Sequence, residues 1–384
     1  MTARTRGVVL AISTSVMAFA FVGGYLGQAL AKDDTYQHLR VFEDVVSLVL
    51  NNYVEPVDVR QAMKGAMKGL ADGLDPESAY LTADLVKALE SNDAGGPAEV
   101  GLDLTRQYYL RVVAARDGSP AAKAGLRPGD FIRAIDNVPT RDMSAYEGSR
   151  LLRGAAGSKV SLLVIRGNAA DPHVIELVRE RLAGPELTSR MANPSTGYVR
   201  VAEFTAATPA QVTQALGALT KSGASRFVID LRGTARGDLD HGIAAARLFV
   251  KEGRLAVRLT RADQREPVAA QPGDGAVTAP AAILVDQGTA GAAEVFAAAL
   301  EGNDRADLVG INSLGRAARQ RLVKLPDQSG LWLTYVRYLT PDNDPIHETG
   351  LEPDVEVELP EVEFGSDPPP GDATLQKALD HLAR

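Results

Sequence analysis

The most constraining feature of the chain is an alternation of strand-like and helix-like segments in its C-terminal half. Short runs rich in β-branched residues alternate with longer amphipathic or alanine-rich stretches, at 197–201, 209–219, 227–231, 239–250, 281–285 and 292–300. Such alternation is typical of an α/β domain, in which helices pack on a sheet. We therefore predict an α/β core over residues 184–360.

Length and composition limit the remaining possibilities. A chain of 384 residues is long enough for two to three domains. It has 41 basic and 49 acidic residues, and the net charge of -8 argues against nucleic acid as a partner. The sequence contains no cysteine, which excludes disulfides, thiolate metal sites and a thiol nucleophile.

The amino terminus has the pattern of an export signal. Arg4 and Arg6 precede an uncharged, mostly apolar run over residues 7–31. The sequence Ala29-Leu30-Ala31 suits signal cleavage, whereas the whole run is also long enough to span a bilayer as an anchor. Both interpretations of segment 1–31 stay open. Both predict an exported protein in the periplasm or cell envelope, and the second anchors it to the inner membrane.

Composition shifts mark further borders. Apolar residues recur at helical spacing over 36–53 and 59–70, which predicts a small N-terminal helical domain at 32–92. The turn-rich sequence SNDAGGP (91–97) then separates it from a compact, β-rich domain at 98–183. Near the C-terminus we predict a stiff, proline-rich linker at 361–372 and a terminal helix at 373–384.

The β-rich domain contains the sequence SPAAKAGLRPGD (119–130), followed by LLRG (151–154) and GSKV (157–160). These motifs closely resemble the bacterial PDZ signature. The resemblance implies a loop whose backbone N–H groups receive a peptide carboxylate, and a following strand that pairs with the peptide. We predict that the peptide-binding residues are Val100, Gly101, Leu102, Asp103 and Leu104. Peptide or protein C-termini are the predicted partners.

Motifs elsewhere occur in the order seen in one protease family. They are YVEPVD (53–58), LDPESAYL (74–81), GYVR (197–200), DLRG (230–233), RYLTP (337–341) and GLEPD (350–354). With the PDZ motifs between them, they resemble the carboxy-terminal processing serine peptidases, or tail-specific proteases. The resemblance implies an α/β core of the ClpP/crotonase type, with the PDZ domain inserted before it. It also implies a serine nucleophile and a lysine base, with no metal and no cofactor.

The two reactive positions of that family are substituted in this sequence. The stretch that resembles the family's Ser-Ala-Ser-Ala-Ser-Glu reads TAGAAE (289–294), so the nucleophile position is Gly291. The family's Phe-Gly-Lys-Gly corresponds to LGRA (314–317), so the base position is Arg316. Glycine has no oxygen to attack with, and arginine stays protonated, so neither residue performs the step. The family's supporting glutamine corresponds to Gln320.

The resemblance places the oxyanion region at Gly233 and Ala292. The turn that contains Gly233 reads DLRGTARG (230–237), and Arg236 puts a bulky charge where the family has a flexible position. This substitution predicts a disturbed oxyanion pocket.

Other residues offer little replacement chemistry. Thr289 and Ser313 lie near the two positions, but we interpret them as ordinary loop residues. Asp230 and Arg232 are expected to form structural hydrogen bonds. The five histidines show no metal-binding spacing, and His241 is interpreted as a solvated residue at a helix start.

Three hypotheses for function follow. The first is an exported pseudoprotease that binds peptide or protein C-termini and regulates or scaffolds proteolysis, with an active protease or an envelope protein as partner. The alternative is an active serine-type endopeptidase of the same family that cleaves near protein C-termini. The third is a purely structural role in an envelope assembly.

Overall fold

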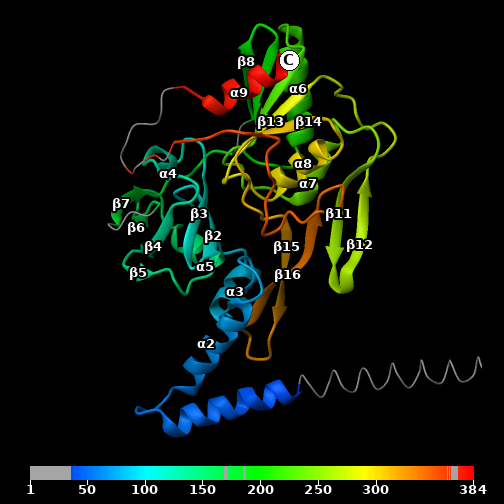
Figure 1. Cartoon of the computed structure of the whole chain (residues 1–384). Coiled ribbons are helices and arrows are strands. Elements are labelled where there is room, and N and C mark those ends of the chain that lie inside the picture. The colour runs from blue at the N-terminus through cyan, green and yellow to red at the C-terminus, as the bar shows by residue number, and fades with distance from the viewer. Residues whose placement is uncertain (1–35, 168–171, 185–186, 361, 363, 365–370) are drawn as a thin grey trace, which may run out of the picture. The chain divides into compact units, whose positions relative to one another are not determined.

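The computed structural model describes residues 36–384 except 168–171, 185–186, 361, 363 and 365–370 (Figure 1). The predicted segment 1–31 lies outside the described residues. By its internal contacts the chain divides into two units, residues 1–67 and 68–384. Among the described helices, none is long and apolar enough to cross a bilayer.

The described part of the first unit contains two helical segments. Residues 36–52 form one helix. The second helix is α2 (Val59–Asp72). Both helices match the periodicity of the sequence. The apolar side chains of the helix at 36–52 are largely exposed, including Leu39, Phe42 and Leu48.

In the second unit, residues 102–178 fold around an antiparallel sheet in the order β2-β3-β4-β6-β7, with β5 paired to β4. Its strands are β2 (Leu102–Gln107), β3 (Tyr109–Ala115), β4 (Phe131–Ile135), β5 (Val138–Pro139), β6 (Lys159–Ile165) and β7 (His173–Val178). Its two helices are α4 (Pro120–Lys123) and α5 (Ala145–Leu151). Leu110, Ile132 and Leu162 are fully buried between them. Strand β2 lies at the edge of this sheet, next to α5.

The core contains a second sheet, in the order β17-β14-β13-β10-β9-β8. Its strands are β8 (Thr188–Asn193), β9 (Thr196–Arg200), β10 (Arg226–Asp230), β13 (Ala281–Val285), β14 (Ala306–Gly310) and β17 (Val355–Glu356). All neighbours in it pair in parallel except β8, which is antiparallel to β9. The prediction of an α/β core is therefore confirmed.

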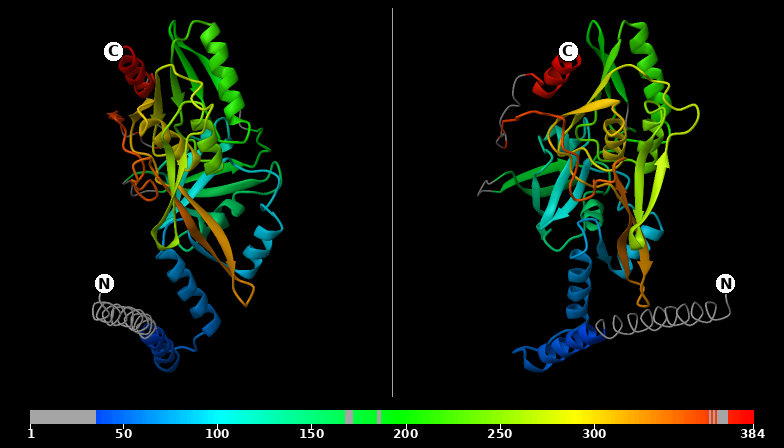
Figure 2. Two further views of the ribbon diagram at one scale, coloured as in Figure 1. Left: turned by 90° about the vertical axis from the view of Figure 1, so that its right-hand side faces the viewer. Right: turned by 45° about the vertical axis from the view of Figure 1, so that its right-hand side comes forward.

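Helices cover both faces of this sheet (Figures 1 and 2). On one face pack α6 (Thr208–Lys221), α7 (Leu239–Ala246) and α8 (Ala292–Glu301), around residues such as Phe227 and Ile283. On the other face, α9 (Ala373–Leu382) packs against Val228 and Leu284. Successive side chains of a strand point to opposite faces of the sheet. Because helices cover both faces, both sets of side chains are buried, and these strands are continuous apolar runs in the sequence.

The sequence did not predict a third sheet, in the order β1-β16-β11-β12 with β15 paired to β16. Its strands are β1 (Ala79–Leu81), β11 (Arg254–Thr260), β12 (Gln264–Ala269), β15 (Ala318–Lys324) and β16 (Gly330–Leu339). Strand β1 lies inside the predicted helical domain 32–92, yet it pairs with β16, Ala79 opposite Trp332. Helix α3 (Ala83–Glu90) packs on this pair through Val86.

Candidate functional site: a core cavity and a peptide groove

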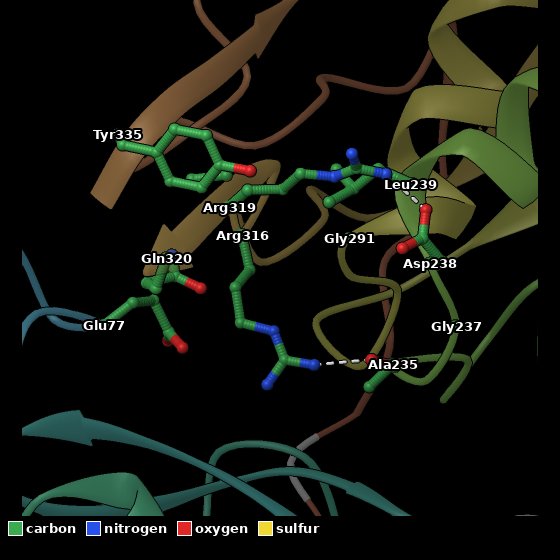
Figure 3. A pocket seen from close by; sticks show the side chains of 11 residues that line it. Glu77, Ala235, Gly237, Asp238, Leu239, Gly291, Arg316, Arg319, Gln320 and Tyr335 are labelled. Atoms are coloured by element: carbon green, nitrogen blue, oxygen red, sulfur yellow. Dashed lines mark hydrogen bonds and ion pairs between the residues drawn. The ribbon is translucent and has the colours of Figure 1, made fainter. Parts of the chain in front are cut away.

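A cavity of about 460 Å³ opens beside the carboxyl ends of the parallel core strands (Figure 3). Loops after β10, β13 and β14 meet at this edge, which is where α/β sheets usually bind ligands. Its lining residues are Glu77, Ala235, Gly237, Asp238, Leu239, Gly291, Arg316, Ala318, Arg319, Gln320 and Tyr335. Three residues that the sequence singled out, Gly291, Arg316 and Gln320, thus share one cavity. Glu77, Asp238, Arg319 and Tyr335 were not anticipated there.

Gly291 stands at the turn from β13 into α8 with φ 64° and ψ −115°. This backbone conformation is strained for any residue with a side chain. A strained strand-to-helix turn is how other hydrolases expose a nucleophile. A Cβ added at Gly291 would meet only the carbonyl oxygen of Arg316, at 3.9 Å. The turn therefore has room for a side chain that the sequence does not supply.

The carboxylate of Glu294 joins this turn to the loop that carries Arg316. Glu294 is fully buried and accepts hydrogen bonds from the N–H groups of Gly291 (2.9 Å), Gly315 (2.5 Å) and Arg316 (2.8 Å), and from the Ser313 hydroxyl (2.5 Å). Burial raises the pKa of Glu294 above its ordinary value, and the four hydrogen bonds oppose that shift. Sequence reasoning missed this role, although Glu294 closes the TAGAAE motif.

The Arg316 side chain extends across the cavity (Figure 3). Its guanidinium donates to the carbonyl oxygen of Ala235 and lies 3.5 Å from that of Leu104. It forms no ion pair with any described residue. Arg319 behaves differently, because it pairs with Asp238 and with Asp240 at 2.9 Å. Gln320 donates to the Thr334 hydroxyl at 3.1 Å.

In the predicted oxyanion region the structure shows contacts that the sequence did not suggest. The N–H of Gly233 donates to Asp286 at 2.8 Å, so it is already engaged. Burial raises the pKa of Asp286, and hydrogen bonds from Gly233 and Gly288 counteract the shift. Ala292 is the first residue of α8. Arg236 does not line this cavity, because its side chain turns toward the β-rich domain.

The two hydroxyl residues near the cavity are committed to structural contacts. Thr289 is fully buried, and its hydroxyl donates to the carbonyl oxygen of Leu231 at 2.9 Å. Ser313 is buried, donates to Glu294, and accepts from the N–H of Leu351 at 2.8 Å. Both hydroxyls are therefore engaged in hydrogen bonds within the core.

The remaining candidates are also accounted for within the described chain. Asp230 and Arg232 form an ion pair at 2.5 Å that extends to Asp372, the residue before α9, at 2.8 Å. The ring of His241 lies 3.4 Å from the carbonyl oxygen of Phe204. Among the described residues, no group of three or more histidine or acidic side chains is arranged to hold a metal ion.

A second, smaller cavity of about 140 Å³ lies between the loop before β2 and helix α5, and we call it the peptide groove. Its lining residues are Glu99, Val100, Gly101, Leu102, Asp103, Ser149, Leu152, Arg153 and Arg236. The groove contains four of the five residues predicted to bind peptide, and the fifth, Leu104, follows directly in β2. Gly101 has φ 79°, and a Cβ there would lie 2.3 Å from the Cβ of Ser119. Only glycine fits this close approach.

The groove and the core are in direct contact. The Arg236 side chain, from the turn after β10, hydrogen-bonds both carboxylate oxygens of Asp103 at 2.8 and 3.0 Å and those of Glu99 at 3.3 and 3.2 Å. Beside it, Val113 and Ala114 of β3 pack against Ala235 and Ala290 of the core.

Comparisons with known proteins agree with this architecture. The profile of Peptidase family S41 matches residues 195–357, and that of the PDZ domain matches residues 111–166. A carboxyl-terminal-processing protease of Synechocystis is 33% identical over 91% of this chain and 83% of the relative. A carboxy-terminal-processing protease of Bartonella bacilliformis is 30% identical over 96% of this chain and 86% of the relative. The solved structure of a photosystem II D1 C-terminal processing protease superposes with a TM-score of 0.72 at 29% identity, over 89% of this chain and 91% of that one.

Proposed function

This chain belongs to the family of carboxyl-terminal-processing proteases, and we propose that within it the protein is a pseudoprotease. It binds the C-terminal ends of peptides or proteins and regulates or scaffolds proteolysis, without cutting the chain that it holds. The observation that carries the proposal is that Gly291 and Arg316 line one cavity, with a glycine at the predicted nucleophile position and a permanent cation at the predicted base position.

The chemistry of a serine–lysine pair explains why both substitutions matter. The hydroxyl attacks only when a neutral amine accepts its proton, and burial must lower the lysine pKa for that amine to exist near neutral pH. A guanidinium has no such neutral form in this range.

The N-terminal sequence supports an exported location. We propose that the protein acts in the periplasm or cell envelope, either released after signal cleavage or anchored to the inner membrane by residues 7–31. Its partner would then be an active protease of that compartment, or an envelope protein whose C-terminus occupies the peptide groove.

A cleavage assay on the full chain tests the proposal. The substrate is a protein with an apolar C-terminal tail, and the variants are Gly291→Ser, Arg316→Lys and the double change. We expect no cleavage by the unmodified protein or by either single variant, and cleavage only by the double variant. Cleavage by the unmodified protein would contradict the proposal and favour the alternative, an active serine-type endopeptidase. Thr289→Ala and Ser313→Ala would then show whether either hydroxyl is responsible.

Peptide binding is tested separately. A short peptide with a free carboxylate is expected to bind more tightly than its amidated twin. Equal affinity for both would remove the terminal carboxylate from the proposed recognition.

A further inference from the structure

The peptide groove has an electrostatic problem. The backbone predicted to receive a peptide carboxylate, residues 100–102, lies between two acidic side chains, Glu99 and Asp103. Both side chains are mostly buried, with exposed fractions of 13% and 18%, so solvent screens their charge poorly. Left alone, these carboxylates would repel the very group that a PDZ groove receives.

The core supplies the compensating charge. Arg236 contacts both acids, with ion-pair distances of 2.8 Å to Asp103 and 3.2 Å to Glu99. Burial, which works against a charged guanidinium, is outweighed by these two carboxylates, and the pKa of Arg236 is raised. Arg236 therefore stays charged and neutralises the loop from outside the β-rich domain.

Two further arginines give the groove a positive surplus. Glu99 also pairs with Arg153 at 3.1 Å and lies 3.6 Å from Arg116. Three guanidiniums thus face two carboxylates. Arg153 is the most exposed of the three, at 30% against 25% for Arg236 and 15% for Arg116, and it lines the groove. The uncompensated positive charge is available where a ligand would enter.

Most residues that line the groove are charged or polar, and three are apolar. Val100, Leu102 and Leu152 are buried and line the cavity, and about 140 Å³ holds one small or medium side chain. A ligand that matches the groove has a free terminal carboxylate for the positive charge and a small apolar last side chain that can contact Leu102 and Leu152.

We propose that the core completes this peptide site: Arg236 cancels the charges of Glu99 and Asp103, so that Arg153 and the loop backbone receive a free C-terminal carboxylate. The inference rests on the proposed function, in which the groove binds C-termini. It adds that carboxylate recognition depends on a residue of the protease-like core, 133 positions away from Asp103 in sequence. Peptide binding and contact between the two domains therefore support each other.

A groove that Arg236 blocks would respond to loss of the arginine with higher peptide affinity, and a groove that Arg236 completes with lower affinity. If Arg236 were a latch that fills the groove, a peptide would have to displace it, and removing the arginine would tighten binding. If Arg236 completes the site, removing it leaves two buried acids beside the ligand and weakens binding.

Fluorescence anisotropy on the full chain separates these cases. The probe is a short fluorescein-labelled peptide ending in Val, used with a free carboxylate and as its amide. We expect Arg236→Gln to weaken binding of the free-carboxylate probe roughly five- to twentyfold, the range of partly buried charge pairs, and to leave the amide nearly unchanged. Adding Glu99→Gln and Asp103→Asn to that variant should restore most of the affinity, because the repelling charges are gone.

A second variant and a control separate loss of groove charge from a general loss of contact between the two domains. Arg153→Gln leaves Arg236 in place and is expected to weaken the free-carboxylate probe by a similar factor. Asp117→Asn removes another ion pair between the domains, the 3.1 Å contact with Arg200, but lies outside the groove. Its affinity for the probe should match that of the unmodified protein.

The outcomes distinguish the inference from the function on which it rests. If the unmodified protein bound neither probe, the proposed peptide binding would fail, and the inference with it. If it preferred the free carboxylate while Arg236→Gln bound that probe equally well or more tightly, only the inference would be overturned.

Discussion

The peptide groove and the core cavity differ in which atoms supply their chemistry. In the groove, the loop backbone at residues 100–102 lies beside Arg153 and Arg236, and Gly101 occupies a position where no side chain fits. In the cavity, the backbone turn at Gly291 is tied to Glu294, and the predicted nucleophile and base positions are occupied by glycine and arginine. Binding in the groove would draw on backbone and several charged side chains together, whereas acyl transfer depends on one nucleophile and one base.

The largest expected effect concerns Glu294, whose carboxylate connects the Gly291 turn to the loop of Arg316 in the core cavity. We expect Glu294→Ala to lower the free energy of unfolding by about 3 kcal/mol or more, because four donors would lose their buried acceptor. Urea unfolding of the full chain measures it. Glu301→Ala, at the other end of the same helix and partly exposed, is the control and should change stability by less than about 1 kcal/mol. Similar losses in both variants would mean that the cavity does not depend on this carboxylate.

Gly101 tests how tightly the groove is built. Gly101→Ala should cost about 2–4 kcal/mol, because the strain of a positive φ adds to a collision with Ser119. Gly118→Ala has a comparable φ of 70° and no atom within 4 Å of the added Cβ, so it should cost only about 1–2 kcal/mol. Thermal unfolding of both variants, with peptide affinity as a second readout, measures the difference. Equal losses of stability in the two variants would show that the loop around Gly101 can shift to accommodate a side chain.

A substitution at Gly291 tests whether the core cavity has space for a side chain at the predicted nucleophile position. Gly291→Ala should cost about 1–2 kcal/mol from backbone strain alone, because the added Cβ meets no atom closer than 3.9 Å. Gly237→Ala, in the same cavity, should cost more, since its Cβ would lie 2.4 Å from the carbonyl oxygen of Phe204. The same unfolding measurement ranks them. The reverse order would argue against an open nucleophile position.

The smallest effect concerns acid pH and the groove. Burial raises the pKa of Glu99. Hydrogen bonding and charge from Arg236, together with the charges of Arg153 and Arg116, outweigh burial and bring this pKa below its ordinary value. A lowered pKa contributes stability that is complete above the pKa of the unfolded chain and is lost as pH falls through the folded one. Stability measured against pH should therefore decline less steeply in the acid range for Glu99→Gln than for the unmodified protein.

The control for that measurement is Glu176→Gln, in an exposed pair with Lys159 at 3.0 Å. Exposed pairs contribute little, so its acid decline should follow that of the unmodified protein. If Glu99→Gln declined as steeply as this control, the arginine cluster would not be stabilising the loop.

Local sequence patterns carried much of the fold. The helices at 36–52 and 59–72, the strands at 131–135 and 281–285, and α8 follow directly from periodicity and composition, because each is decided by residues near one another in the chain. The ordered motifs likewise identified the protease family and its PDZ domain, which the comparisons confirm. The degenerate state of Gly291 and Arg316 remains a prediction from those motifs.

The third sheet escaped prediction for a physical reason. Strand β1 pairs with β16 across some 250 residues, and β15 reads ARQRLVK, with charged and half-exposed side chains that show no clean alternation. A strand of this kind is stabilised by its partner rather than by its own sequence. Nothing within β1 or β15 identifies that partner.

The sequence by itself identified the PDZ domain, the protease-family core and their order, and it places glycine at 291 and arginine at 316, since these are properties of single positions and short motifs. Only the tertiary structure decided what the substituted residues do instead. Arg236 was expected to disturb the oxyanion pocket, yet its side chain lies against Asp103 and Glu99 in the peptide groove. Glu294 gathers donors from a loop about twenty residues away. Such contacts depend on where folding brings distant side chains, and burial then gives each charge its strength.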